Sequence, residues 1–299
     1  MRKGFKGLSK SAKYIAITLF LIILLYCFSL LMMYGWGLST SLKSLAEYRK
    51  SLYSLPQGWP WEWEWENYVR VFEAISVPVM LNGVRGEANF AIMFFNTFTY
   101  AALGAVLTTF FQWCCAYLIS KFPYLWGKFI FSFNLIMMFI PITGNLASSL
   151  QIFKALGLYD NWLYVIFNSI GFGGMNLLIF HAFHEGLGNE YTEAARIDGA
   201  GNNAIMFKII LPLSRQIFLS VAMMAFIARW NDYMTMVVWM PNHPTMAYGI
   251  FYFSVTTTSE FSWPHKQIAA CMILVVPILI LYLFFQKTML ENLRVGGLK

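Results

Sequence analysis

The sequence predicts an all-α membrane protein with about six transmembrane helices. Of its 299 residues, 59% are hydrophobic and only 12% are charged, whereas soluble domains average about half apolar and a quarter charged. Apolar runs near the roughly 20 residues that a helix needs to cross a bilayer recur along the chain. They occupy residues 14–34, 97–119, 129–146, 162–183, 217–240 and 268–285.

The charged residues predict the orientation of these spans. The first run follows a basic stretch, is too long for the apolar part of a signal peptide and has no small-residue cleavage pattern, so we expect a retained helix with a cytoplasmic amino terminus. Alternation then places residues 121–128, residues 189–212 and the basic tail inside, with both termini cytoplasmic. The net charge of +7 therefore reflects orientation and not nucleic-acid binding.

The long outside segment, residues 39–96, is rich in tryptophan. Trp61, Trp63 and Trp65 alternate with glutamates, and this period of two predicts an extended strand with rings on one side and carboxylates on the other. The rings could seat the segment in the lipid headgroup layer or contact an extracytoplasmic protein. Because no linker or repeat divides the chain, we expect residues 1–299 to form a single transmembrane domain.

The inside segment, residues 189–212, predicts a helix, a sharp turn and a second helix. Residues 191–197 lack Gly and Pro and include two alanines, which favours a short helix. Gly199 can adopt the left-handed conformation that ends it. Residues 204–210 can form the second helix, and Pro212 suits the first turn of the following span. An ordinary amphipathic connector is the alternative.

The spelling of this segment resembles a known motif. The residues are Glu193, Ala194, Ala195, Arg196, Ile197, Asp198, Gly199 and Ala200, followed by Phe-Lys-Ile-Ile-Leu-Pro at 207–212. They resemble the EAA loop of permease subunits of binding-protein-dependent ABC importers of type I. The resemblance implies that Glu193, Ala194, Ala195, Arg196, Asp198, Gly199 and Ala200 form a coupling loop that docks into a cytoplasmic ATPase. Small alanines with charges at their rim suit such a contact.

A second segment resembles the carbohydrate-type, maltose-permease-like members of that family. It is Trp230-Asn231-Asp232, supported by Asn-Tyr at 67–68 and Leu-Gly-Leu at 156–158. Sugar hydroxyls need donors and acceptors, and sugar CH faces can rest on aromatic rings. We therefore expect a substrate pathway that includes Trp230, Asn231, Asp232, Tyr233 and Asn145. Arg229 and Asp232 could instead neutralise each other as structural neighbours, and Asn134 is a further polar candidate that could simply satisfy a neighbouring helix.

Catalytic and metal chemistry find little support. His181, His184 and Glu185 reverse the order of a zincin motif, so we expect interfacial histidines and no metal site. The four cysteines fall within apolar runs and predict neither disulfides nor metal ligation. The sequence has no phosphate-binding loop of the GxxxxGK(S/T) type, so we expect no ATPase site, and no cofactor, in this chain.

The resemblance implies a multi-pass subunit of a bacterial cytoplasmic membrane that imports a sugar, with an oligosaccharide expected. Its expected partners are a homologous second permease, two ATP-binding subunits that hold ATP and Mg, an extracytoplasmic solute-binding protein, the sugar and membrane lipid. Two alternatives remain open: a permease of the same superfamily for a non-sugar solute, and an ion-coupled secondary transporter. The second needs several buried ionisable residues at mid-membrane, and only Arg229 and Asp232 qualify.

Overall fold

A computed structural model describes residues 9–81, 83–122, 125–140, 143–171, 173–256 and 263–295. The last four residues of the tail, 296–299, lie outside this description. The chain divides into two compact units, which are described separately below. Unit 1 comprises Met1–Ala74 and Phe253–Val275, and unit 2 comprises Ile75–Tyr252 and Val276–Lys299.

The described residues are mostly helical, as the sequence predicts. Three helices are long and apolar enough to cross a membrane: Ser11–Ser41, Phe90–Lys121 and Pro264–Lys287. A bent pair, Asn202–Leu213 with Arg215–Trp230, gives a fourth if it is counted as one span. The arrangement with six spans therefore stays a prediction.

Unit 1 is built around the end of α1 (Lys10–Ser41). The short α2 (Leu45–Lys50) begins with a reciprocal cap, in which Ser44 and Glu47 bond each other's backbone amide. Asn67, at the start of α3 (Glu66–Ala74), donates from Nδ2 to the carbonyls of Ser41 and Lys43 at 3.0 Å each. These bonds fix α3 to the chain that leaves α1. The first part of α15 (Pro264–Val295) completes the unit.

The tryptophan-rich segment of unit 1 contradicts the expected strand, because it folds as consecutive turns. Gly58 has a positive φ of 81°, and Glu62 turns its carboxylate back to accept from the Trp59 amide at 2.9 Å. The Trp59 and Trp61 rings stack at 5.2 Å and are both largely exposed. Backbone bonding by the glutamate therefore overrides the period-two pattern.

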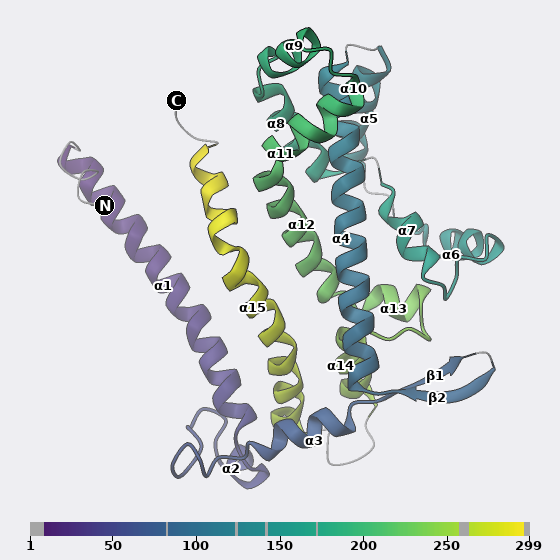
Figure 1. The fold of residues 1–299 in the computed structure, drawn as a ribbon. Helices are drawn as coiled ribbons and strands as arrows, with labels where there is room; N and C mark the ends of the chain where they lie inside the picture. Colours follow the sequence, from purple (N-terminus) through teal and green to yellow (C-terminus); the bar gives the residue numbers. More distant parts are fainter. Residues whose placement is uncertain are drawn as a thin grey trace. The chain divides into compact units, whose positions relative to one another are not determined.

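Unit 2 is organised around α4 (Phe90–Lys121), which packs against α12 (Arg215–Trp230) and α8 (Met175–Gly186), as Figure 1 shows. It also contacts α5 (Leu125–Phe139) and α7 (Leu163–Ser169). Trp113, Leu177 and Phe180 are fully buried in the core between these helices. Unit 2 also contains α6 (Leu146–Ala155), α13 (Met234–Trp239) and α14 (Met246–Val255), and the last residues of α14 belong to unit 1.

Three of the expected spans depart from the prediction: two are interrupted, and the run at 129–146 is helical only as far as Phe139, where α5 ends. The run at 162–183 divides into α7 and α8 around a glycine-rich break, in which Gly174 has a positive φ of 106°. The run at 217–240 divides at Asn231 into α12 and α13. Both interruptions lie in unit 2.

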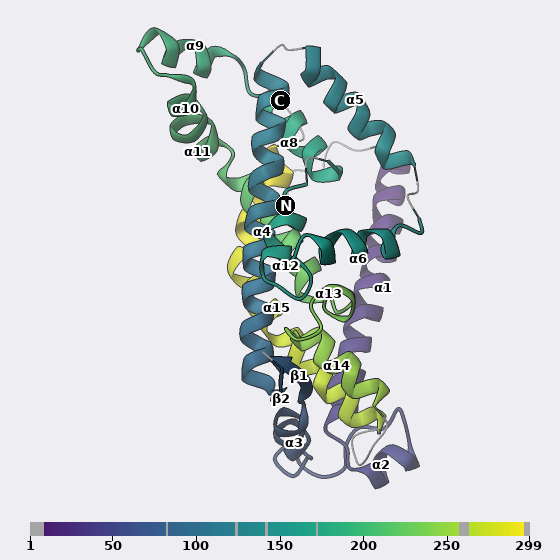
Figure 2. The ribbon, with the colours of Figure 1, turned by 90° about the vertical axis from the view of Figure 1, so that its right-hand side faces the viewer.

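A two-stranded antiparallel hairpin departs from the all-α expectation. Strand β1 (Val77–Leu81) pairs with β2 (Val84–Ala88), with Val77 opposite Ala88. The Met80 amide of β1 donates to Asn242 Oδ1 at 2.6 Å, and Asn242 in turn bonds Asp160. The hairpin lies near α14, at the end of unit 2 opposite the segment that follows α8 (Figures 1 and 2).

Candidate functional site

The predicted coupling loop folds as a helix, a turn and a second helix, as expected. Helix α9 (Glu190–Ile197) ends before Gly199, which has a positive φ of 79°. The second helix begins as α10 (Asn202–Ala204). It continues as a wider π-helical turn, η1 (Ile205–Ile210), which the sequence did not predict, and ends as α11 (Leu211–Leu213) with Pro212 in its first turn.

The loop has one buried face and one exposed face. Ala195 is 6% exposed and Thr192 is 8% exposed, whereas Glu193, Ala194 and Arg196 are exposed. Asp198 and Gly199 in the turn are exposed as well, and Ala200 is partly buried. Ile197 is 86% exposed. The exposed face therefore combines a small residue, charges and one apolar side chain.

The buried face joins the loop to the membrane helices. Ala195 belongs to the same core cluster as Trp113 of α4 and Phe180 of α8. Lys121, the last residue of α4, donates to the Leu187 carbonyl and to Asn189 Oδ1 immediately before α9. These contacts connect the first helix of the loop directly to α4 and α8.

The second half of the loop joins α12 at a sharp bend. The axis of Asn202–Leu213 makes an angle of 74° with that of Arg215–Trp230. The loop stands at one end of unit 2, away from α13 and α14 (Figure 2). The second helix therefore runs across the direction of α12.

The reversed His-x-x-His-Glu pattern packs against aromatic rings. His181 stacks on Phe131 at 4.3 Å between ring centroids. His184 is fully buried and meets the edges of Trp113 and Tyr117 at 5.6 Å each. In the described part of the chain, no group of three His, Cys, Asp or Glu residues could hold a metal.

The candidate pathway residues at the end of α12 separate into buried and accessible groups. Trp230 is 1% exposed and packs against Phe94 and Phe226. Asn231 is exposed, and its side chain donates to the Ile227 carbonyl at 2.9 Å. Tyr233 is 36% exposed and stacks on Phe251 at 4.6 Å. Asn231 and Tyr233 are therefore accessible on the surface of this chain, whereas the Trp230 ring is not.

Asp232 stabilises the interruption between α12 and α13. Its Oδ2 accepts from the Tyr100 hydroxyl at 2.7 Å, and its Oδ1 accepts from the Thr235 amide at 3.0 Å. The carboxylate thereby caps the start of α13 and ties it to α4. It is half-buried.

Arg229 does not neutralise Asp232 directly. Its guanidinium donates to Thr108 Oγ1 at 2.6 Å and to Ser169 Oγ at 3.2 Å. Among the described residues, no ion pair forms between Arg229 and Asp232. The arginine therefore links α4, α7 and α12 through hydroxyl groups.

The break between α7 and α8 is satisfied by side chains of other helices. Gln112 donates to the Gly173 carbonyl at 2.8 Å, and Asn134 Oδ1 accepts from the Gly174 amide at 2.7 Å. Irregular backbone at membrane depth needs such partners because lipid supplies none. The sequence signal for this break is Gly171-Phe-Gly-Gly174, which lies inside the apolar run at 162–183 that predicted one continuous span. Asn134 thus satisfies a neighbouring helix, whereas Asn145, exposed before α6, forms no side-chain bond in the described structure.

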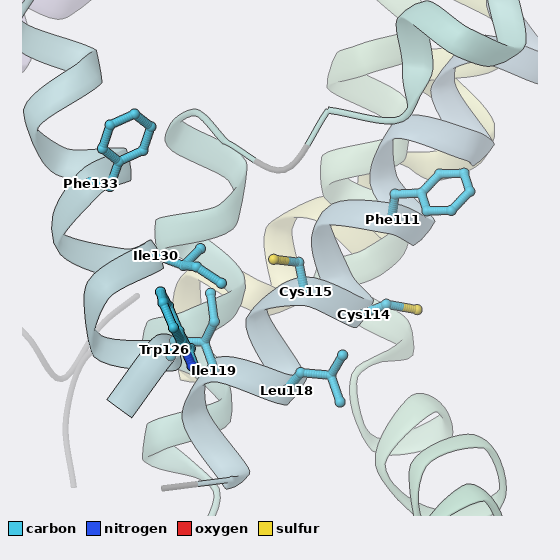
Figure 3. Close-up of a pocket in the computed structure, with 9 residues that line it drawn as sticks. Phe111, Cys114, Cys115, Leu118, Ile119, Trp126, Ile130 and Phe133 are labelled. Carbon is cyan, nitrogen blue, oxygen red and sulfur yellow. The ribbon is translucent and has the colours of Figure 1, made fainter. Parts of the chain in front are cut away.

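A pocket of about 760 Å³ opens between α4 and α5. Cys115 and Ile119 of α4 point toward α5, and Trp126 and Ile130 of α5 point back (Figure 3). Its other lining residues are Phe111, Cys114, Leu118, Gly127 and Phe133. Because nearly every lining group is apolar, the pocket cannot satisfy the hydroxyls of a sugar. It is not the solute site.

Interrupted apolar helices around a packed core are typical of membrane transport proteins. The sequence profile of the family described as "Binding-protein-dependent transport system inner membrane component" matches residues 114–294. The chain belongs to this family.

Relatives of known description cover most of the chain. It is 26% identical over 88% of its length to the sulfoquinovosyl glycerol transport system permease protein SmoH of Agrobacterium fabrum, covering 87% of that protein. It is 24% identical to the inner membrane ABC transporter permease protein YcjP of Escherichia coli, over 100% of both chains. The maltodextrin transport system permease protein MdxG of Bacillus subtilis is 28% identical, covering 68% of this chain and 74% of that protein.

A solved structure has the same fold. It is a bacterial ABC transporter involved in the import of the acidic polysaccharide alginate, and it matches with a TM-score of 0.71 at 22% identity. The match covers 94% of this chain and 98% of that chain. The membrane permease fold is therefore shown by both sequence and structure.

Proposed function

We propose that this chain is the permease subunit of an ATP-driven ABC importer for a carbohydrate, with an oligosaccharide as its solute. The family membership carries the proposal. The substrate class is supported by the names of relatives that transport sulfoquinovosyl glycerol and maltodextrin. Asn231 and Tyr233 add an exposed amide and an exposed ring, which suit a sugar.

The importer requires other subunits. A second, homologous permease completes the pathway, and two ATP-binding subunits beneath it hold ATP and Mg. A solute-binding protein delivers the sugar outside, where segment 39–96 lies. In this arrangement the chain spans a bacterial cytoplasmic membrane six times with both termini inside, and it has no ATPase site of its own.

The exposed face of α9 and its turn dock into the ATPase in this mechanism. Glu193, Ala194, Arg196, Asp198 and Gly199 are the accessible docking residues, and Ala195 and Ala200 attach the element to the core. ATP binding moves the docked loop, and the contacts of Ala195 with α4 and α8 carry that movement inward. Alternating access then follows from rigid-body rocking between two states of different affinity for ATP.

The solute passes the interruption at the end of α12 in this proposal. Asn231 and Tyr233 offer the first contacts, while Asp232 holds the break and the buried Trp230 supports it. Asn145, exposed before α6, is a further contact for the solute.

The docking claim is tested at two glycines of the same loop. Gly199 has a φ of 79°, which a β-branched residue does not tolerate, whereas Gly201 has a φ of −72° and open space around its Cα. We expect Gly199→Val to abolish sugar uptake and solute-stimulated ATP hydrolysis in the reconstituted importer. Asp198→Pro is expected to have the same effect, because it removes the amide that donates to the Ala194 carbonyl.

Gly201→Val is the matched control, and it should retain uptake. Membrane insertion of all variants is checked by fractionation and thermal unfolding. Normal uptake by an inserted Gly199→Val permease would refute coupling through this loop.

A further inference from the structure

Unit 1 contains a polar pocket that the proposed transport mechanism does not use. It has a volume of about 400 Å³, within the range of about 300–1,000 Å³ typical of small-molecule sites. Its lining residues come from the α1–α2 connection, α3 and the start of α15: Ser44, Leu45, Glu64, Glu66, Asn67, Arg70, Trp263, His265 and Lys266. Unlike the pocket between α4 and α5, it is lined mainly by charged and hydrogen-bonding groups.

The pocket lies where two apolar helices end. Ser44 follows the end of α1 by three residues, and His265 is the second residue of α15. Both helices are long and apolar enough to cross a membrane. A Cβ on Gly37 would lie 2.5 Å from Met272 Cε, so the two helices pack closely just inside these ends. The pocket therefore lies beside the ends of two candidate membrane spans.

The lining charges are of both signs. Glu66 pairs with Arg70 at 3.0 Å, whereas Glu64 forms no ion pair with any described residue. On the α15 side, Lys266 is only 8% exposed, and His265 is 1% exposed with a buried Nδ1 that no described group bonds. A ligand that brings an anionic and a cationic group together would match this lining.

The rest of unit 1 suits the membrane surface. Helix α3 exposes Val69 and Phe72, three residues apart, on the side away from Asn67. Together with Tyr68, Glu73 and Ile273 these residues line a second, mainly apolar groove of about 310 Å³. Exposed tryptophans of the preceding turns add amphipathic rings of the kind enriched at bilayer interfaces. Helix α3 thus has a polar side facing the pocket and an apolar side fit for acyl chains.

We propose that this pocket binds the headgroup of a zwitterionic phospholipid with a primary amine, as in phosphatidylethanolamine. Lys266, His265 and Arg70 face the phosphate, and Glu64 accepts hydrogen bonds from the ammonium. A primary ammonium donates three such bonds, whereas a quaternary choline donates none, so the carboxylate selects between the two. Phosphatidylglycerol places uncharged glycerol hydroxyls where the ammonium would lie, so it leaves the charge of Glu64 uncompensated.

The test measures which lipid the purified full-length permease retains. The protein in detergent is incubated with an equimolar mixture of dioleoyl phosphatidylethanolamine, phosphatidylcholine and phosphatidylglycerol, and bound lipids are counted by native mass spectrometry. We expect about tenfold more phosphatidylethanolamine than phosphatidylcholine on the wild-type chain. Glu64→Gln should bring the two lipids to near parity, and Arg70→Gln should lower the retention of both.

Glu87→Gln is the control, because it makes the same chemical change on β2, outside the lining of the pocket. It should leave the preference unchanged, and thermal unfolding should show that every variant is folded. Equal retention of the three lipids by the wild type would overturn the proposal. An unchanged lipid preference in Glu64→Gln would also overturn the proposal. This holds even if that variant loses its affinity for a solute-binding protein. Sugar uptake is not part of this readout, so the result is independent of the proposed transport function.

Discussion

Gly104 of α4 lies directly against the guanidinium of Arg229 in α12, where a Cβ at position 104 would collide with Arg229 Nε. The absence of a side chain lets the arginine cross the surface of α4 and reach Thr108 and Ser169. A charged group inside a membrane helix needs such partners. The glycine therefore makes the three-helix contact of α4, α7 and α12 possible.

We expect Gly104→Ala to destabilise the protein, although alanine is the better helix former. The methyl group displaces Arg229 from its hydroxyl partners, and overpacking of this kind costs about 1–3 kcal/mol. The measurement is thermal unfolding of the purified permease in detergent. Gly35→Ala in α1 is the control, because nothing lies within 4 Å of its Cβ position, and it should be neutral or slightly stabilising. Equal unfolding temperatures for the two variants would contradict the close contact.

The two alanines of the coupling loop should respond differently to enlargement. Ala195 is buried against the core of unit 2, so Ala195→Leu should lower the unfolding temperature. Ala194 is exposed, so Ala194→Leu should leave stability unchanged and weaken only the association with the ATPase subunits. Thermal unfolding and co-purification of the ATPase separate the effects. The interpretation of the two faces fails if Ala194→Leu destabilises the isolated chain as much as Ala195→Leu does.

Gln112→Leu should weaken the interruption between α7 and α8. The Gly173 carbonyl loses its donor, and an unsatisfied buried polar group costs about 1–3 kcal/mol. Gln286→Leu removes a comparable bond, from Nε2 to the Leu283 carbonyl, at an exposed position, and it should have little effect. Hydrogen exchange of residues 173–177 provides the measurement. Equal protection in the two variants would show that Gln112 does not support the break.

Acid should loosen the α1–α2 connection through Glu47. Burial alone raises the pKa of this carboxyl, but the amides of Ser44 and Gln57, the Ser44 hydroxyl and the Lys43 charge outweigh it and hold the pKa below its usual value. Because the folded-state pKa is depressed, the stabilisation is complete above the unfolded-state pKa and is lost as pH falls through the folded-state value. We expect the tryptophan fluorescence of unit 1 to change below about pH 4.5, where an unperturbed Glu titrates.

Glu47→Gln should remove that acid transition, because the side chain no longer titrates. Glu87→Gln on β2 should retain it. A transition that persists unchanged in Glu47→Gln would assign the titration to another group.

The sequence predicted the coupling loop closely, because its determinants are local. The helix over 191–197 and the left-handed Gly199 depend on residues within one or two turns. Pro212, expected in the first turn of the next span, lies instead at the end of the second helix of the loop, before the bend to α12. The π-helical turn at Ile205–Ile210 depends on packing against α4 and α8, which no local pattern encodes. Burial of Ala195 but not of Ala194 has the same origin.

The pattern of apolar runs does not predict the interruptions of the spans. Gly171, Gly173 and Gly174 sit in a segment whose mean composition is that of a membrane helix, and the donors that permit the break come from Gln112 and Asn134, far away in sequence. The roles of Asp232 and Arg229 likewise depend on Tyr100, Thr108 and Ser169 of other helices. The strand predicted from the Trp61–Trp65 pattern was wrong, because Glu62 accepts from the Trp59 amide and stabilises a turn.

The 74° bend between Asn202–Leu213 and Arg215–Trp230 makes the second helix of the coupling loop a lever arm that lies across the axis of α12. A force parallel to the axis of α12, applied at the end of this lever arm that is far from α12, produces a torque about the bend at Ser214. In the proposed mechanism we therefore expect the docked loop to tilt α12 instead of sliding it lengthwise. Tilting moves the opposite end of the helix furthest, and that end carries Arg229 and the interruption at Asn231.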